Sequence, residues 1–98
     1  MARFAVYRLA SSEFVLDCQA DLLGFLETRF VVPLLDLAAV PTPVHRLHPV
    51  FAVAGLELVM ATHLATAIDR HELEGPVATL EHEGYAISNA LDMLISGF

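Results

Sequence analysis

With 98 residues, the chain is long enough for one hydrophobic core and too short for two, so residues 1–98 are expected to form a single domain. Hydrophobic residues make up 56% of it and charged residues 17%, against about 25% in ordinary soluble domains, and this apolar excess favours an oligomer or an interaction module covered by a partner. Five arginines and no lysine against twelve acidic residues give a net charge of −7, which argues against direct binding of nucleic acid.

The first third of the chain contains three short runs typical of β-strands. Residues 3–9 and 14–20 are rich in Phe, Val, Tyr and Leu, and the four residues between them suit a hairpin connection. Residues 30–32, a run of Phe and Val, predict a third strand. Proline belongs at the end or the edge of a strand, so Pro33 is expected to close this one.

The middle of the chain contains the clearest β pattern. Two prolines within residues 34–44 exclude a long regular element there. Residues 50–53 and 56–62 predict two strands joined by a tight corner, in which Gly55 supplies the positive φ that a short hairpin turn needs. A further short strand is expected within residues 64–68.

The last segment changes from the period of a strand to that of a helix. Gly75 and Pro76 are expected to interrupt regular structure, and from about Glu81 the apolar residues recur every three or four positions. The recurring positions are Gly84, Ile87, Leu91, Leu94 and Phe98. We therefore expect an amphipathic C-terminal helix that ends at Gly97. The predicted fold is mainly β, a small curved antiparallel and barrel-like sheet with one α-helix at its end.

Three sets of residues are candidates for chemistry, and none of them is complete. His45 and His48 are three positions apart, but no Cys pair or HExxH sequence completes a metal site, so surface or half-buried histidines are expected. Asp17 and Asp21 resemble a pair of catalytic carboxylates, yet two acids at the end of a strand are expected to be simply solvated. Cys18 is expected to point into the core as a small apolar group. The sequence therefore predicts no catalytic site, no metal and no cofactor, and favours a binding module.

Membrane insertion and export are not expected from this sequence. The longest stretch without a charged side chain, residues 58–68, has eleven residues, about half of what a helix needs to span a bilayer. Arg3 and Arg8 leave no uninterrupted apolar core for a secretion signal. The lone Cys18 cannot close a disulfide within the chain, which fits the reducing cytoplasm.

Six blocks of sequence, taken in order, carry a resemblance to a known family. The blocks are VY (6–7), LDCQADLL (16–23), FVVPLL (30–35), LHPVF (47–51), MATHLA (60–65) and ISNALDMLISGF (87–98). Together they resemble the CcdB family of bacterial toxins over residues 4–98, with one short deletion between the first two strands and one in the proline-rich loop.

This resemblance implies a small SH3-like barrel with a C-terminal helix that forms a homodimer. It also implies a toxin without catalysis or cofactor, which binds the A subunit of DNA gyrase, a topoisomerase, and traps the complex of gyrase with cleaved DNA. A CcdA-like antitoxin is expected to wrap the dimer in the cytoplasm and release gyrase. Because this chain carries a charge of −7, its antitoxin segment is expected to be less acidic, or more basic, than one that serves a neutral toxin.

The resemblance places the gyrase-binding surface at the end of the second strand and at the end of the helix. The matching positions are Leu22, Leu23, Asn89, Asp92, Ile95, Ser96, Gly97 and Phe98. Ser96 stands where the best-known gyrase poison of the family has a Trp that is central to its contact, and Asp92 stands where it has an Asn. Ile95 replaces an aromatic residue, Phe98 replaces an aliphatic one, and Glu83 stands where the family favours Arg.

Further apolar residues around this surface have a structural interpretation as well. Ile87, Leu91 and Leu94 lie at helical spacing and are expected in the core or in a dimer interface. Leu22 and Leu23 are adjacent in the sequence and cannot both face one core easily, so at least one of them is expected to be exposed.

Two alternatives to gyrase poisoning remain open from the sequence. The first is a divergent family member that keeps the dimer and the antitoxin but has lost or changed the gyrase target, and the changes at Ser96 and Asp92 motivate it. The second is a ribonuclease toxin, because MazF-type ribonucleases share this fold. That activity needs basic residues beside a proton acceptor, and the five arginines are too scattered along the sequence to predict such a cluster.

Overall fold

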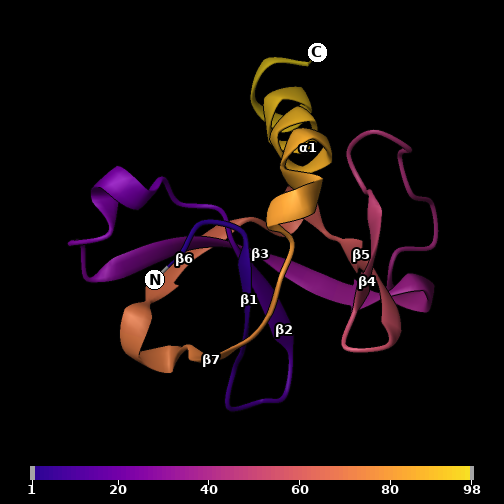
Figure 1. Cartoon of the computed structure of the whole chain (residues 1–98). Coiled ribbons are helices and arrows are strands. Elements are labelled where there is room, and N and C mark those ends of the chain that lie inside the picture. The colour runs from indigo at the N-terminus through magenta and orange to yellow at the C-terminus, as the bar shows by residue number, and fades with distance from the viewer. Residues whose placement is uncertain (1, 98) are drawn as a thin grey trace.

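The computed structural model describes residues 2–97, which form one curled antiparallel sheet of seven strands and an α-helix that stands on it (Figure 1). The strands are β1 (Ala5–Arg8), β2 (Phe14–Asp17), β3 (Thr28–Asp36), β4 (Val50–Val53), β5 (Leu56–Met60), β6 (Thr66–Asp69) and β7 (Glu74–Thr79). The helix is α1 (Gly84–Ser96), and the short 3-10 turns are η1 (Asp21–Leu23), η2 (Leu37–Ala39), η3 (Thr62–Leu64), η4 (Arg70–Glu72) and η5 (Glu81–Glu83). The expected fold class, mainly β with one C-terminal helix, is confirmed.

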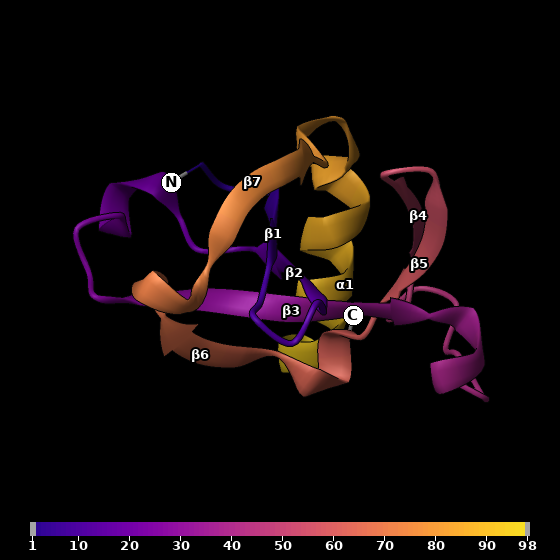
Figure 2. The ribbon, with the colours of Figure 1, turned by 90° about the horizontal axis from the view of Figure 1, so that it is seen from below.

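The long strand β3 organises the sheet, whose strand order is β4-β5-β3-β2-β1-β7. On one side β3 pairs with β2, and on the other it pairs first with β6 and then with β5. Figure 2 shows β3 crossing the molecule, with the connection from β6 to β7 at one end and the β4–β5 hairpin at the other. The sheet therefore forms half of a barrel.

Strand β3 runs through Pro33 to Asp36, so the expected end of the third strand at that proline is wrong. Val31 is the last β3 residue paired with β6, and Leu34 is the first one paired with β5. Pro33 faces Val15 of β2 on one side, and on the other side it stands where β3 changes from β6 to β5, so that neither of these two strands pairs with it or needs the N–H that proline lacks. Its carbonyl oxygen is used, because the N–H of Ala61 donates to it at 2.9 Å.

Strand β7 contradicts the expectation that Gly75 and Pro76 interrupt regular structure. Among the described residues β7 pairs with β1 alone, so a residue without an N–H is tolerated at this edge of the sheet. Its register shifts between Val6 and Arg8 of β1, an irregularity that the glycine and the proline accommodate. The strand therefore continues through Gly75 and Pro76, whereas its residue-by-residue pairing with β1 is interrupted there.

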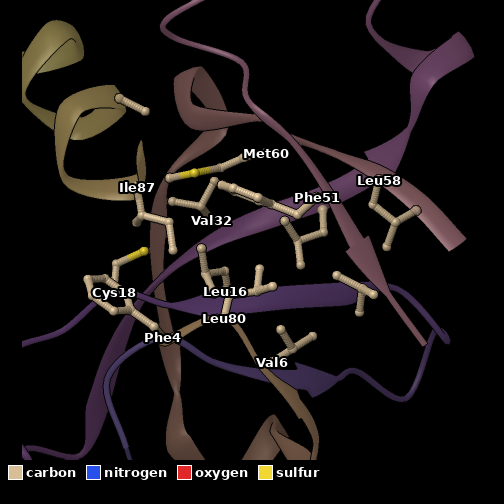
Figure 3. Packing of buried hydrophobic residues seen from close by; sticks show 13 residues of the cluster. Phe4, Val6, Leu16, Cys18, Val32, Phe51, Leu58, Met60, Leu80 and Ile87 are labelled. Carbon is tan, nitrogen blue, oxygen red and sulfur yellow. The ribbon is translucent and has the colours of Figure 1, made fainter. Parts of the chain in front are cut away.

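The core lies between the sheet and α1, and Figure 3 shows its side chains converging there. Ile87 and Ala90 of α1 are fully buried in the same cluster as Met60 of β5. Cys18 belongs to this cluster too, which confirms its predicted place in the core. Burial, followed by the negative charge of Asp17, raises the pKa of Cys18 to about 12, so the thiol stays protonated and unreactive at neutral pH.

Glycines stand at both ends of α1 for different reasons. At Gly84 a Cβ would lie 3.0 Å from Cε2 of Phe4, so the missing side chain lets the helix begin close to the residue that precedes β1. Gly97 has a φ of 78° and donates its N–H to the carbonyl of Met93, which is the left-handed cap that glycine favours. The predicted end of the helix at Gly97 is confirmed.

The turn between β4 and β5 has positive φ at both central residues, 50° at Ala54 and 80° at Gly55. This is the pattern of the hairpin turn for which Asn-Gly is the preferred pair, and alanine is strained in it. Replacing Ala54 with Asn is therefore expected to raise the free energy of unfolding by about 0.5–1 kcal/mol, as measured by urea denaturation. Nothing lies within 4 Å of a Cβ placed on Gly55, so Gly55→Ala changes only the backbone preference and should lower stability. A gain in stability from Gly55→Ala would contradict this account of the turn.

Candidate functional site

The outward face of α1 carries three of the eight residues that the sequence places in a binding site, together with Tyr85, which sequence reasoning missed. Tyr85, Asn89, Asp92 and Ser96 follow one another at a spacing of three or four residues, which puts them on one stripe of the helix. Asn89 is half-buried and the other three are exposed, with Tyr85 84% exposed. Ile95 lies beside this stripe and is 78% exposed, although it is a large aliphatic residue.

The three apolar residues of α1 that the sequence assigns to the core or to a dimer interface differ in how far they are buried. Ile87 is fully buried, and Leu91 is partly buried and packs against the core. Leu94, one turn later, is 41% exposed because α1 extends past the strands there (Figure 1). Gly97 is exposed at the end of the helix, and Phe98 lies outside the described residues.

A second apolar surface lies on the segment that contains η1. Leu22 is 86% exposed and Leu23 is 42% exposed, which confirms that at least one of them lies on the surface. Phe25 and Leu26 follow and are also exposed, at 73% and 38%. We call these four residues the η1 patch. Sequence reasoning missed its last two members, although a run of apolar residues without a helical or strand period is a usable signal for such a patch.

Hydrogen bonds from nearby and distant parts of the chain hold the η1 segment in place. The N–H of Arg3 donates to Oδ1 of Asp21 at 2.8 Å, and Nε2 of Gln19 donates to the carbonyl of Leu23 at 2.9 Å. Nη1 of Arg70, from η4, donates to the carbonyl of Gly24 at 3.2 Å. The exposed side chains of the η1 patch are therefore presented by a fixed backbone.

Beneath this segment lies a fully buried ion pair between Asp17 and Arg29. Nη2 and Nε of Arg29 donate to Oδ2 of Asp17 at 2.7 and 3.0 Å, and the N–H of Gln19 donates to Oδ1 at 3.1 Å. Asp17 is thus not solvated, and that expectation is wrong, because a partner far along the chain neutralises it inside the fold. Asp21 is exposed and bonded elsewhere, so the two acids do not form a catalytic pair.

The histidines take a different arrangement from the expected one. His48 is buried, not surface or half-buried, and it contacts His63 rather than His45. Its Nδ1 accepts the N–H of Val44 at 2.9 Å, so a neutral His48 carries its proton on Nε2, which lies 2.8 Å from Nδ1 of His63. A protonated nitrogen cannot bind a metal, and among residues 2–97 no three His, Cys, Asp or Glu side chains gather into a metal site.

Stability is expected to fall in acid because of His48. Burial, with His63 as a second cause, lowers the pKa of His48 below its ordinary value of about 6.5, so the unfolded chain takes up the proton first. The contribution of neutral His48 to the free energy of unfolding is complete above pH about 6.5, and it is lost as the pH falls from there through the lowered pKa of the folded state. His48→Asn, which keeps an acceptor for Val44, should show a smaller loss of free energy of unfolding between neutral and acidic pH. His71→Asn at an exposed site is the control, and equal acid sensitivity of wild type and His48→Asn would contradict the prediction.

A groove of about 730 Å³ runs between α1 and the proline-rich loop that leads into β4. Its lining residues are Pro43, His45, Arg46, His48, Pro49, Val50, Tyr85, Ala86 and Asn89. Asn89 is the one residue of the predicted binding surface that lines it. Sequence reasoning missed the groove, because its two walls lie far apart along the chain.

The described part of the chain contains no helix that is both long and apolar enough to cross a bilayer. In comparisons with known proteins, the family model described as "CcdB protein" matches residues 3–97, a span that includes the η1 segment, the groove and α1. A search of curated proteins found no match.

Proposed function

From the premise that the chain belongs to the CcdB family of toxins of toxin–antitoxin systems, we propose that it binds the A subunit of DNA gyrase and traps gyrase on cleaved DNA. The observation that carries this proposal is the exposed end of α1, where Ile95 and Leu94 face solvent beyond the sheet. Ile95 is one of the positions that the sequence resemblance assigns to the gyrase contact, and Leu94, which the sequence assigns to the core or a dimer interface, precedes it. Large apolar side chains exposed at a helix end are typical of a contact surface.

We further propose that the toxin acts as a homodimer. In one chain the η1 patch and the end of α1 lie apart (Figures 1 and 2), so a continuous surface made of both requires a second copy. Among the described residues, thirteen large hydrophobic side chains are exposed, and four of them lie together in the η1 patch, which a second copy could cover. A CcdA-like antitoxin then neutralises the dimer in the cytoplasm, and no cofactor or catalytic step is needed.

Two assays test the proposal. Expression of the chain alone should arrest the growth of bacteria, and co-expression of the antitoxin should restore it. With purified gyrase, ATP and supercoiled plasmid, the chain should convert plasmid to linear, protein-linked DNA. Ile95→Asp should abolish this conversion, whereas Leu56→Asp, a matched change at an exposed position of the β4–β5 hairpin, should not. Absence of any cleaved complex would refute the gyrase proposal.

The second candidate function is a family member that has lost the gyrase target, and Ser96 favours it. Ser96 is exposed on the last turn of α1 and offers no aromatic surface where the family poison has its Trp. Such a protein would bind its antitoxin and form the dimer without trapping gyrase. Sedimentation and antitoxin binding together with the gyrase assay distinguish the two functions.

Four of the five arginines weigh against a ribonuclease, whereas the fifth, Arg46, is exposed in the groove that also contains His45 and His48. Arg29 is sequestered by Asp17 in the core, and Arg70 donates to backbone carbonyls of the η1 segment. Arg3 and Arg8 lie over the rings of Phe4 and Phe14. A sequence-selective pattern of RNA cleavage that is lost on substituting an arginine would overturn this assignment.

A further inference from the structure

The groove beside α1 has a different charge character from the rest of this acidic chain. The chain has twelve acidic residues, yet none of them is among the residues that line the groove. The lining instead includes Arg46, which is exposed, together with His45 and His48. The groove therefore lacks the acidic side chains of the rest of the chain, and Arg46 gives its lining a formal charge of opposite sign to the net charge of −7.

The lining of this groove combines hydrogen-bond donors with apolar side chains. Arg46 supplies a guanidinium that can bind a carboxylate through two parallel hydrogen bonds. On the opposite wall, Tyr85 supplies a phenolic hydroxyl and Asn89 an amide, both from the outward face of α1. Four apolar residues complete the lining: Pro43, Pro49, Val50 and Ala86. An occupant that matches this lining carries carboxylates and an apolar side chain together.

The loop that forms one wall of the groove is fixed before anything binds. The N–H of Val44 donates to Nδ1 of His48 at 2.9 Å, and the N–H of His48 donates to the carbonyl of Val44 at 2.8 Å. Oγ1 of Thr62 donates to the carbonyl of Leu47 at 2.5 Å, and the N–H of Met60 donates to the carbonyl of Pro49 at 2.9 Å. A wall that is already ordered lowers the entropic cost of binding.

The size of the groove indicates what kind of occupant it takes. Its volume of about 730 Å³ is within the range of about 300–1,000 Å³ that is typical of ligand pockets, and it is too large for a single inorganic ion. The groove is also open along one side, since its two walls are the loop and the face of α1. An extended peptide can therefore lay several side chains in it.

We propose that this groove binds an acidic peptide segment with an apolar side chain, contributed by a partner protein. The proposal rests on the proposed function in one respect only, the expectation that the antitoxin of this toxin supplies the segment. It also refines the expectation from net charge: the antitoxin segment should be basic or neutral where it meets the acidic surface and acidic where it crosses the groove.

The test uses the ¹⁵N-labelled full chain and the synthetic peptide acetyl-Asp-Glu-Leu-Asp-Leu-Glu-amide. Titration should shift the backbone amide resonances of His45, Arg46, Ala86 and Asn89. A control peptide with Asn and Gln in place of the acids should bind much more weakly. Arg46→Glu should weaken binding about tenfold or more, and the milder Arg46→Gln should weaken it less. Arg8→Glu, the same charge change on an exposed residue of β1, should leave binding close to the wild-type value.

Several outcomes would overturn the proposal. They are no shift at millimolar peptide, shifts confined to another surface, equal binding of the uncharged peptide, or equal weakening by Arg46→Glu and Arg8→Glu. Groove resonances that shift on dilution of the chain but not with peptide would show that a second copy occupies the groove instead. The gyrase cleavage assay is read separately: normal trapping without peptide binding overturns the groove proposal alone, and peptide binding without trapping overturns the gyrase proposal alone.

Discussion

Replacing Arg29 with Met is expected to lower the free energy of unfolding by about 3–5 kcal/mol, a large part of the roughly 5–15 kcal/mol that holds a domain of this size together. Both partners of the Asp17–Arg29 pair are fully buried, so the substitution leaves the Asp17 carboxylate without a counter-charge and away from water. Only the N–H of Gln19 would still donate to it. Urea denaturation followed by circular dichroism measures the change.

A double-mutant cycle shows whether the loss comes from the unpaired charge. Asp17→Leu combined with Arg29→Met removes both charges, so the double variant should be more stable than Arg29→Met alone. Arg8→Met, at an exposed arginine that lies over the ring of Phe14, is the matched control and should cost about 1 kcal/mol or less. If Arg29→Met and Arg8→Met prove equally mild, the buried pair does not stabilise this fold in the way described.

The same pair connects the core to the candidate binding surface. A Cβ placed on Gly24 would lie 3.7 Å from Nη1 of Arg29, so the guanidinium lies directly under the η1 segment. Nη1 has no hydrogen-bond partner among the described residues, and it is buried. Loss of Arg29 should therefore loosen the segment that presents Leu22 and Leu23, in addition to destabilising the core.

The elements that the sequence predicted well are those fixed by short-range chemistry. The β4–β5 hairpin follows from a turn whose Gly55 adopts positive φ, and α1 follows from its apolar period and its cap at Gly97. The errors at Pro33 and at Gly75 and Pro76 have one cause. In both places the neighbouring strands of the sheet tolerate a residue without an N–H, so the chain continues as a strand. The local sequence carries no information about which strands those neighbours are.

The candidate site, too, has features that the sequence indicated and features that have no local sequence signal. The resemblance indicated Asn89, Asp92 and Ser96 on α1, Tyr85 was missed, and the adjacent leucines indicated exposure of at least one of Leu22 and Leu23. The contact between His48 and His63 joins residues 15 positions apart, and the groove joins the proline-rich loop to α1. Neither has a local signature, because the loop that carries His48 lies against η3 in one case and faces α1 in the other.

Ser96→Trp is expected to raise the affinity for the A subunit of gyrase by about 30-fold to 1,000-fold, which corresponds to the roughly 2–4 kcal/mol that a Trp hot spot contributes. Ser96 is exposed at the end of α1, so an indole there enters no part of the core. It would lie next to Ile95, which is already 78% exposed, and would extend the apolar surface there. Binding to the immobilised gyrase protein and the half-maximal concentration for plasmid cleavage measure the change.

The control must distinguish a specific contact of the introduced Trp with gyrase from non-specific hydrophobic association. Ser11→Trp places the same side chain on an exposed serine before β2, far from α1, and should not change gyrase binding. Asp92→Asn restores the amide that the family poison has on the same helical stripe and should add to the effect of Ser96→Trp. If the double variant binds gyrase no better than the wild type, the α1 end is not a gyrase surface, and positions other than 92 and 96 have diverged as well. A gain at position 96 that grows with Asp92→Asn shows that the α1 end still has the shape of a gyrase surface, and the cleavage assay on the wild type then distinguishes a toxin that traps gyrase from one that has lost this target.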